Sequence, residues 1–101
     1  MRIEYKSRKL EKQCTDAPTA VRDFGQRNAG RIKQRMQELK HAPSIQTLLI
    51  SRIGRCHPLK GDREGQYAMD LSGGLRLIFR DSGYEGVEVQ AVEIIEIGDY
   101  H

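Results

Sequence analysis

The segment QYAMDLSGGLRLIFR, residues 66–80, decides the fold of this chain. Apolar residues alternate with polar or small ones on both sides of the Gly73-Gly74 pair, a pattern that predicts two strands joined by a tight hairpin turn. The apolar face of this hairpin is predicted to consist of Tyr67, Met69, Leu71, Leu75, Leu77 and Phe79. On the second arm, Arg76, Ile78 and Arg80 therefore belong to the opposite face.

Further strands are predicted on both sides of the hairpin. Residues 81–86 predict a turn, and the apolar run 87–97 predicts a long, central strand. Upstream, residues 56–59 predict a short strand that is followed by a turn at 61–65. At the start of the chain, residues 2–6 alternate Ile and Tyr with charged side chains, which indicates a half-buried strand at a sheet edge.

Between these strands the apolar spacing becomes that of helices. Ser7 is placed to cap a short helix that ends near Cys14, and Thr15 or Asp16 to cap a second helix that runs to about Lys40. Pro18 falls in the first turn of the second helix. The apolar stripe of that helix is predicted to be Val21, Phe24, Ile32, Met36 and Leu39. Its solvent face is predicted to carry Arg22, Arg27, Arg31, Lys33, Arg35 and Lys40.

Two glycines interrupt the second helix. Gly25 and Gly30 each disfavour a helix by about 1 kcal/mol relative to alanine, so a kink or break is expected between them. Pro43 ends this unit, and Ser44 can cap a short helix over residues 45–50.

Helices followed by an antiparallel meander define an α+β fold. We expect the N-terminal strand and the helices to pack on one face of a small, mainly antiparallel sheet, which leaves the other face open for a ligand. With 101 residues, the chain is predicted to form a single domain, 1–101, because it cannot divide so small a core in two.

Composition limits the classes of function. The net charge is +3, and because bases outnumber acids up to Arg63, an anionic partner is favoured. No run approaches the roughly 20 apolar residues that span a bilayer, and no apolar signal region is present, so a cytoplasmic location without membrane contact is expected. Cys14 and Cys56 form no C-x-x-C pair and are expected to stay reduced. No nucleotide-binding motif indicates a cofactor.

Two segments carry side chains for chemistry, HPLKGDR at 57–63 and DYH at 99–101. Metal-free cleavage of an RNA phosphodiester needs a base for the 2′-hydroxyl, cations for the charge on the phosphoryl oxygens, and an acid for the leaving 5′-oxygen. These segments supply all three if the sheet brings them together. The candidate catalytic residues are His57, Lys60, Arg76, Asp99, Tyr100 and His101. The candidate RNA contacts are Arg63, Arg80 and Tyr67.

Several of these residues also have a purely structural interpretation. Arg76 can form a cross-strand ion pair with Asp70 instead of binding a phosphate. His57 can be a satisfied strand residue, and His101 a frayed chain end. A metal site is disfavoured because the cysteines and histidines lack ligand spacing.

Residues 57–65, the LRLIF segment at 75–79 and the final DYH resemble the RelE/ParE toxin superfamily, most closely the HigB-type toxins of bacterial toxin–antitoxin modules. The likeness covers residues 55–101 well, and the first 54 residues only in their order of strand and helices. It implies a RelE-like fold and a toxin that enters the ribosomal A site on the small subunit and cleaves translated mRNA without metal or cofactor. The functional positions it implies are His57, Lys60, Arg76, Asp99, Tyr100 and His101. It also implies a helix-turn-helix, HigA-like antitoxin that holds the toxin inactive. The toxin would contact operator DNA only through this antitoxin.

Two other functions stay open. A ParE-like inhibitor of DNA gyrase would share the fold but would not need acid–base residues. A non-catalytic RNA-binding or interaction protein would use the basic helices, and its salt-sensitive RNA binding would survive loss of Lys60 or His101. The sequence also leaves open which residue is the general base.

Overall fold

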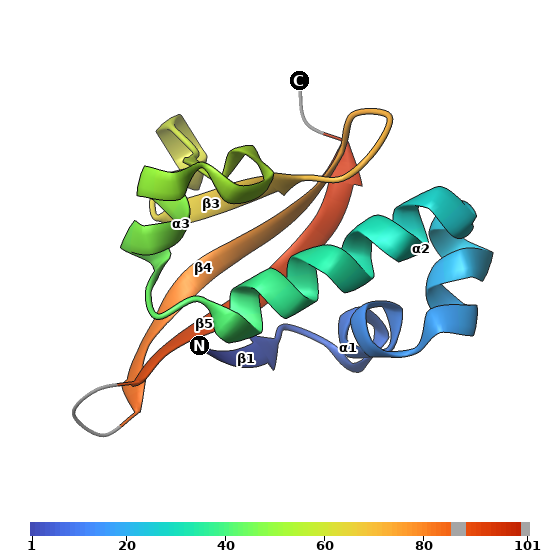
Figure 1. The fold of residues 1–101 in the computed structure, drawn as a ribbon, viewed down its shortest axis with the longest axis horizontal. Helices are drawn as coiled ribbons and strands as arrows, with labels where there is room; N and C mark the ends of the chain where they lie inside the picture. Colours follow the sequence, from blue (N-terminus) through green and yellow to red (C-terminus); the bar gives the residue numbers. More distant parts are fainter. Residues whose placement is uncertain (86–88, 100–101) are drawn as a thin grey trace.

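The computed structural model describes residues 1–85 and 89–99 as an α+β fold with helices packed against one face of a five-stranded sheet (Figure 1). The helices are α1 (Arg8–Thr15), α2 (Ala17–His41) and α3 (Ile45–Ser51), with short 3-10 turns η1 (Ile53–Arg55) and η2 (Gly61–Arg63). The strands are β1 (Arg2–Tyr5), β2 (His57–Pro58), β3 (Gln66–Asp70), β4 (Leu75–Glu85) and β5 (Val89–Asp99). The strand order is β1-β5-β4-β3-β2, and only the edge strand β1 runs parallel to its neighbour. The predicted fold class is therefore confirmed.

Side-chain caps fix where the helices begin. Ser7, Asp16 and Ser44 precede α1, α2 and α3, and each accepts a hydrogen bond from the backbone N–H three residues further on. Each bond satisfies one of the N–H groups that a helix start leaves unpaired. The three predicted helix starts are confirmed, with Asp16 rather than Thr15 as the cap of α2.

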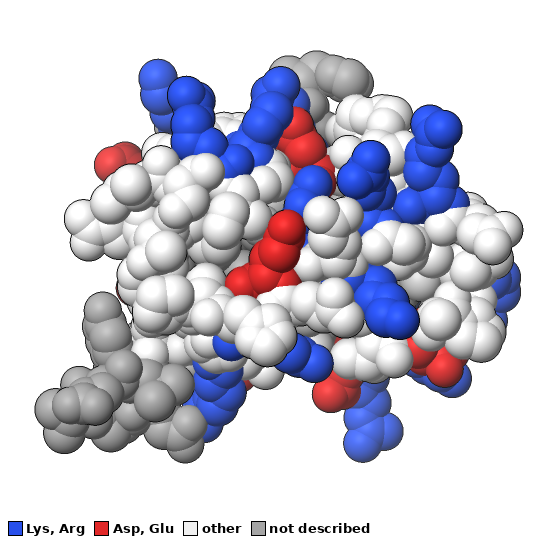
Figure 2. Space-filling model, viewed as in Figure 1, with Lys and Arg blue, Asp and Glu red and all other residues white. Residues whose placement is uncertain are grey.

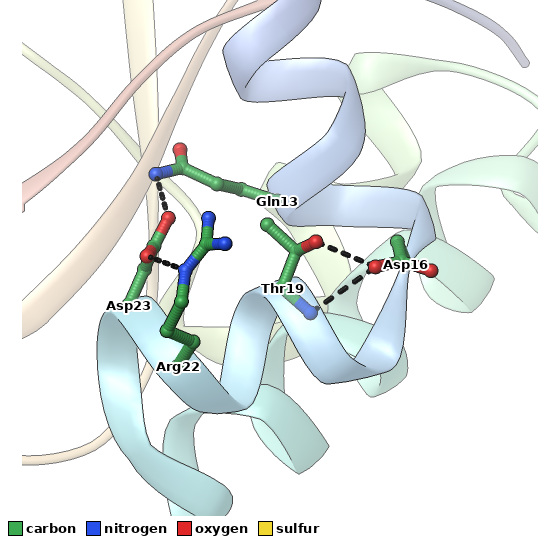
Figure 3. A network of polar contacts seen from close by, with 5 residues as sticks. All are labelled: Gln13, Asp16, Thr19, Arg22 and Asp23. Atoms are coloured by element: carbon green, nitrogen blue, oxygen red, sulfur yellow. Dashed lines mark hydrogen bonds and ion pairs between the residues drawn. The ribbon is translucent and has the colours of Figure 1, made fainter.

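A polar network joins α1 to the start of α2 (Figure 3). Asp16 accepts from the Thr19 backbone N–H at 3.2 Å and from the Thr19 hydroxyl at 2.5 Å. The bond from the hydroxyl is the main cause that holds the pKa of Asp16 below its ordinary value. Across the joint, Gln13 donates to Asp23 at 2.8 Å, and Arg22 donates to the other oxygen of Asp23 at 3.0 Å. These contacts fix the angle at which the chain leaves α1.

The predicted break in the long helix lies at Gly25. Its φ of 85° and ψ of 165° are non-helical and suit glycine, whereas Gly30 stays helical. The break turns the chain, so the first part of α2 runs at a steep angle to the long second part (Figure 1). Ile32 and Leu39 on the second part are buried, but Val21 on the first is 43% exposed. The predicted stripe is wrong at Val21, because a stripe traced across the break at Gly25 does not follow one face of the two parts.

The hydrophobic core lies between the second part of α2 and the sheet. Leu77 and Phe79 of β4 and Ile94 of β5 are fully buried against α2, and each such side chain stabilises the fold by about 1.5–3 kcal/mol. The Tyr67 ring stacks on Phe79 with their centroids 5.6 Å apart. The predicted apolar face of the hairpin is thus confirmed. Within the described residues, no helix has the length and apolar character needed to cross a membrane.

The predicted turn at 81–86 is wrong, because β4 continues to Glu85. The pairing register shifts between Asp81 and Gly83, where Gly83 has a φ of 107° and donates its N–H to the Asp81 carboxylate at 2.8 Å. The polar, glycine-containing segment is therefore a β-bulge. β5, predicted to be central, has a strand on each side, but the middle strand of the sheet is β4. The expected start of β5 at residue 87 lies outside the described residues.

Candidate active site

The sheet face opposite the helices carries polar side chains in rows set by the strand register, with Ala68 and Ile78 fully buried between them. Residues paired across neighbouring strands point to the same side, so each row gathers side chains from several strands. The rows are Asp70, Arg76 and Gly98; His57, Ala68, Ile78 and Glu96; and Gln66, Arg80 and Glu93. We call this side of the sheet the open face.

The Asp70 carboxylate lies at the centre of the first row. One oxygen lies 3.3 Å from Nε of Arg76, and the other lies 2.8 Å from Nε of Arg55. The Asp70–Arg76 ion pair that the sequence allowed is therefore present. Arg55 is the last residue of η1, and Arg52 directly precedes η1; their φ values are 54° and 53°. This left-handed conformation costs a non-glycine residue roughly 1–2 kcal/mol, and such strain is concentrated at functional sites.

Arg35 of α2 supports this centre from the helix layer. Its Nε donates to the Asp70 backbone carbonyl at 2.7 Å, its Nη1 pairs with Glu38 at 2.7 Å, and its side chain is only 10% exposed. Gly54 leaves the space for it, because a Cβ there would lie 2.7 Å from Nε of Arg35. The predicted place of Arg35 on the solvent face of α2 is wrong, because its long side chain reaches past Gly54 to the sheet.

His57 lies on β2 beside this cluster. Its Nδ1 is 2.8 Å from the carbonyl oxygen of Arg55. Because a carbonyl can only accept, Nδ1 carries the proton, and Nε2 of the neutral ring is a proton acceptor. His57, Arg55 and Arg52 line a hollow of about 330 Å³. Burial raises the pKa of the neighbouring Cys56 thiol to about 12, so this thiol is not ionised at neutral pH.

The register brings His57 and Arg76 near each other. They are two strands and one row apart, which places their Cα atoms about 12 Å from each other at ordinary sheet spacings. Two long side chains can close that distance on one phosphodiester. Lys60 is exposed and follows His57 by three residues, in the loop between β2 and η2. The structure therefore gathers His57, Arg76 and Arg55, and Lys60 lies in the loop that follows β2.

The predicted RNA contacts are divided between the two faces. Arg63 pairs with Glu96 at 2.9 Å, and Arg80 pairs with Glu93 at 2.7 Å, both on the open face. Tyr67 packs against the core on the helix side of the sheet. The structure therefore does not bring Tyr67 together with the two arginines.

The predicted C-terminal group is only partly within the described residues. Asp99 ends β5 opposite Leu75, whose face is that of the helices, so the register places Asp99 on the other face from Arg76. It is exposed there. Tyr100 and His101 lie outside the described residues, and their roles stay predictions. In residues 1–85 and 89–99, no group of three or more His, Cys, Asp or Glu side chains is placed to hold a metal ion.

Sequence reasoning missed two residues of this centre, Arg55 and Arg35. The only local signal for Arg55 was a glycine flanked by basic residues, RIGR at 52–55, directly before the Cys56-His57 pair. Arg35 gave no such signal, because its contact with Asp70 joins residues 35 positions apart.

No protein-family model matches the chain, and no curated protein matches its sequence. Its fold is similar to that of solved toxins. A YoeB/ParE toxin from Agrobacterium tumefaciens superimposes with a TM-score of 0.66 at 21% identity, over 100% of both chains. The YoeB dimer from Staphylococcus aureus gives a TM-score of 0.60 at 16% identity, over 100% of this chain and 97% of that chain. At these identities the likeness shows the fold, and it confirms the RelE-like architecture that the sequence predicted.

Proposed function

We propose that this protein is a RelE/ParE-superfamily toxin of a type II toxin–antitoxin system, and that it cleaves mRNA in the ribosomal A site by metal-independent acid–base chemistry. The observation that supports this proposal most is the placement of His57, whose Nδ1 is held by the Arg55 carbonyl on the same face as the Arg55 and Arg76 guanidiniums. The fold shared with a YoeB/ParE toxin supports it further.

In the proposed reaction the 2′-oxygen of the RNA attacks the adjacent phosphorus and the bond to the 5′-oxygen breaks. The products are a 2′,3′-cyclic phosphate and a 5′-hydroxyl. Arg76, Arg55 and Lys60 stabilise the negative charge that grows on the phosphoryl oxygens. Nε2 of His57 performs one of the two proton transfers. The other transfer is assigned to His101 of the C-terminal group, with Tyr100 beside it in sequence, because the register places Asp99 on the helix side of the sheet.

The helix side of the molecule is assigned to the ribosome. Basic side chains project from that side and from its rim, with fewer acidic ones between them (Figure 2). Such a surface binds the phosphates of ribosomal RNA by charge and releases their counterions. The opposite, open face then meets the mRNA. The partners proposed are therefore the small ribosomal subunit in the cytoplasm, mRNA, and a HigA-like antitoxin that holds the toxin inactive.

The test is induced expression followed by primer extension on a translated reporter mRNA. We expect the wild type to arrest growth and to cut within codons, and His57→Ala to lower cleavage by about 10²–10⁴-fold through loss of a proton-transfer group. The matched control is Glu4→Gln, which removes one carboxylate from an ion pair on β1 at the far edge of the sheet and should cut like the wild type. Growth arrest by the wild type with intact mRNA would contradict the proposal.

A second candidate function is inhibition of DNA gyrase, favoured by the ParE name that the Agrobacterium toxin also carries. It predicts that the purified protein blocks gyrase-catalysed supercoiling while mRNA stays intact. If neither activity appears but RNA binding is salt-sensitive and survives Lys60→Ala, the protein is a non-catalytic RNA-binding protein instead.

A further inference from the structure

We propose that Asp70 is a positioning residue that aligns the guanidiniums of Arg55 and Arg76 as a pair for one phosphate group of the RNA. This inference rests on the proposed function, and it names the residue that aims the cations of the site.

Both arginines form ion pairs with Asp70 through Nε, and the contact with Arg55 is the shorter one; the oxygen that faces Arg76 accepts no hydrogen bond from the described residues. Each approaches a different carboxylate oxygen through Nε, at 2.8 Å from Arg55 and 3.3 Å from Arg76. A guanidinium has five N–H donors, and four of them are on the two Nη atoms. In the part of the chain that the structure describes, no other partner of either guanidinium is seen. The Nη groups of both arginines can therefore bind an anion while Nε stays on Asp70.

Asp70 is itself held from two sides. Its backbone carbonyl accepts the Nε–H of Arg35 at 2.7 Å, and its strand position is paired directly with Arg76. The Asp70 side chain is 26% exposed and that of Arg76 is 24% exposed, so water screens this pair less than it screens a surface ion pair. Without the carboxylate, the two arginines would repel each other and lose their common anchor.

Other ion pairs lie on the open face as well. Arg63 pairs with Glu96 at 2.9 Å, and Arg80 pairs with Glu93 at 2.7 Å. Asp70 holds two arginines, and these come from η1 and β4. That arrangement is suited to two guanidiniums that share one phosphate.

The first test is Asp70→Asn, which keeps the side-chain shape and removes the charge. A carboxylate that merely repelled RNA would, when removed, tighten binding and leave cleavage unchanged or faster. A positioning role predicts instead that the maximal single-turnover cleavage rate on ribosomes falls about tenfold to a hundredfold, while half-saturation is not weakened. Glu4→Gln, which removes the same charge at the far edge of the sheet, should keep the wild-type rate. A wild-type rate in Asp70→Asn would overturn the inference and leave the proposed nuclease intact.

The second test does not depend on cleavage. The Nε–H signals of Arg55 and Arg76 are followed by ¹⁵N NMR during titration with inorganic phosphate. We expect both signals to shift together in the wild type and to shift less, and independently, in Asp70→Asn. If the signals behave in this way but the protein does not cut RNA, the positioning role of Asp70 is supported and the proposed nuclease function is contradicted. Absence of a shared response in the wild type would overturn the inference whatever the cleavage assay shows.

Discussion

Gly54 couples the helix layer to the candidate active site, and Gly54→Ala should break that coupling. Its φ is +60°, a left-handed conformation that costs alanine roughly 1–2 kcal/mol. The added Cβ would lie 2.7 Å from Nε and 2.9 Å from Cζ of Arg35, so the guanidinium has to move away from the Asp70 carbonyl. Leaving that partly buried carbonyl without its donor costs about 1–3 kcal/mol. We therefore predict a loss of about 2–5 kcal/mol in the free energy of unfolding.

Urea denaturation followed by circular dichroism measures this loss, and two other glycines provide matched controls. Gly73 has a φ of +66° with open space around it, so Gly73→Ala reports the backbone cost alone. Gly30 is helical and also open, so Gly30→Ala should stabilise the protein by about 0.5–1 kcal/mol.

A double substitution isolates the part of the Gly54→Ala destabilisation that is due to Arg35. In an Arg35→Met background the bond to Asp70 is already absent, so Gly54→Ala should cost no more there than Gly73→Ala costs in the wild type. If Gly54→Ala in the wild-type background is no more destabilising than Gly73→Ala, the claim that Gly54 holds Arg35 in place is refuted.

Three further predictions concern stability and reactivity. Ser44→Ala removes the hydroxyl that caps α3 and should lower the free energy of unfolding by about 1 kcal/mol in urea titrations. Burial raises the pKa of both Cys14 and Cys56 to about 12, so Ellman's reagent at pH 8 should react far more slowly with the native protein than with the urea-unfolded chain. The pKa of Asp16 in the fold is below its ordinary 3.8, so its contribution is present above that value and is lost as the pH falls through the lower, folded pKa. Between pH 5 and about pH 2, the melting temperature of Asp16→Asn should therefore fall by less than that of the wild type, as measured by calorimetry.

Much of the fold was predictable because its determinants are local. The period-two alternation around Gly73-Gly74 and the caps at the helix starts each depend on a few neighbouring residues. The turn expected at 81–86 failed because a short polar segment with glycine suits a bulge as well as a turn. The choice between them depends on a distant residue, since Gln90 of β5 donates to the Asp81 carboxylate at 3.0 Å.

The candidate site was predictable only where sheet register determines it. Arg76 opposite Asp70 follows from the hairpin turn, because the turn fixes which residues pair. Arg55 reaches Asp70 from an irregular segment whose left-handed conformations no hydrophobic period indicates. The buried position of Arg35 depends on the missing side chain of Gly54, a contact between two elements that a pattern within one element does not contain.

The long β4–β5 hairpin extends beyond the rest of the sheet. Within the described residues, β3 pairs with β4 over residues 76–80 and β1 pairs with β5 over 91–94, so no third described strand lies beside the rungs Tyr84–Gln90 and Glu85–Val89. In Figure 1 this arm projects past the helices. A two-stranded ribbon is marginally stable in water, so the backbone amides of Glu85 and Val89 should exchange with deuterium through local opening, whereas Gln90 is buried and accepts the Ile45 backbone N–H at 2.9 Å. The amides of residues 76–80 should exchange only when the whole domain unfolds, and the arm can therefore open while the candidate site keeps its geometry.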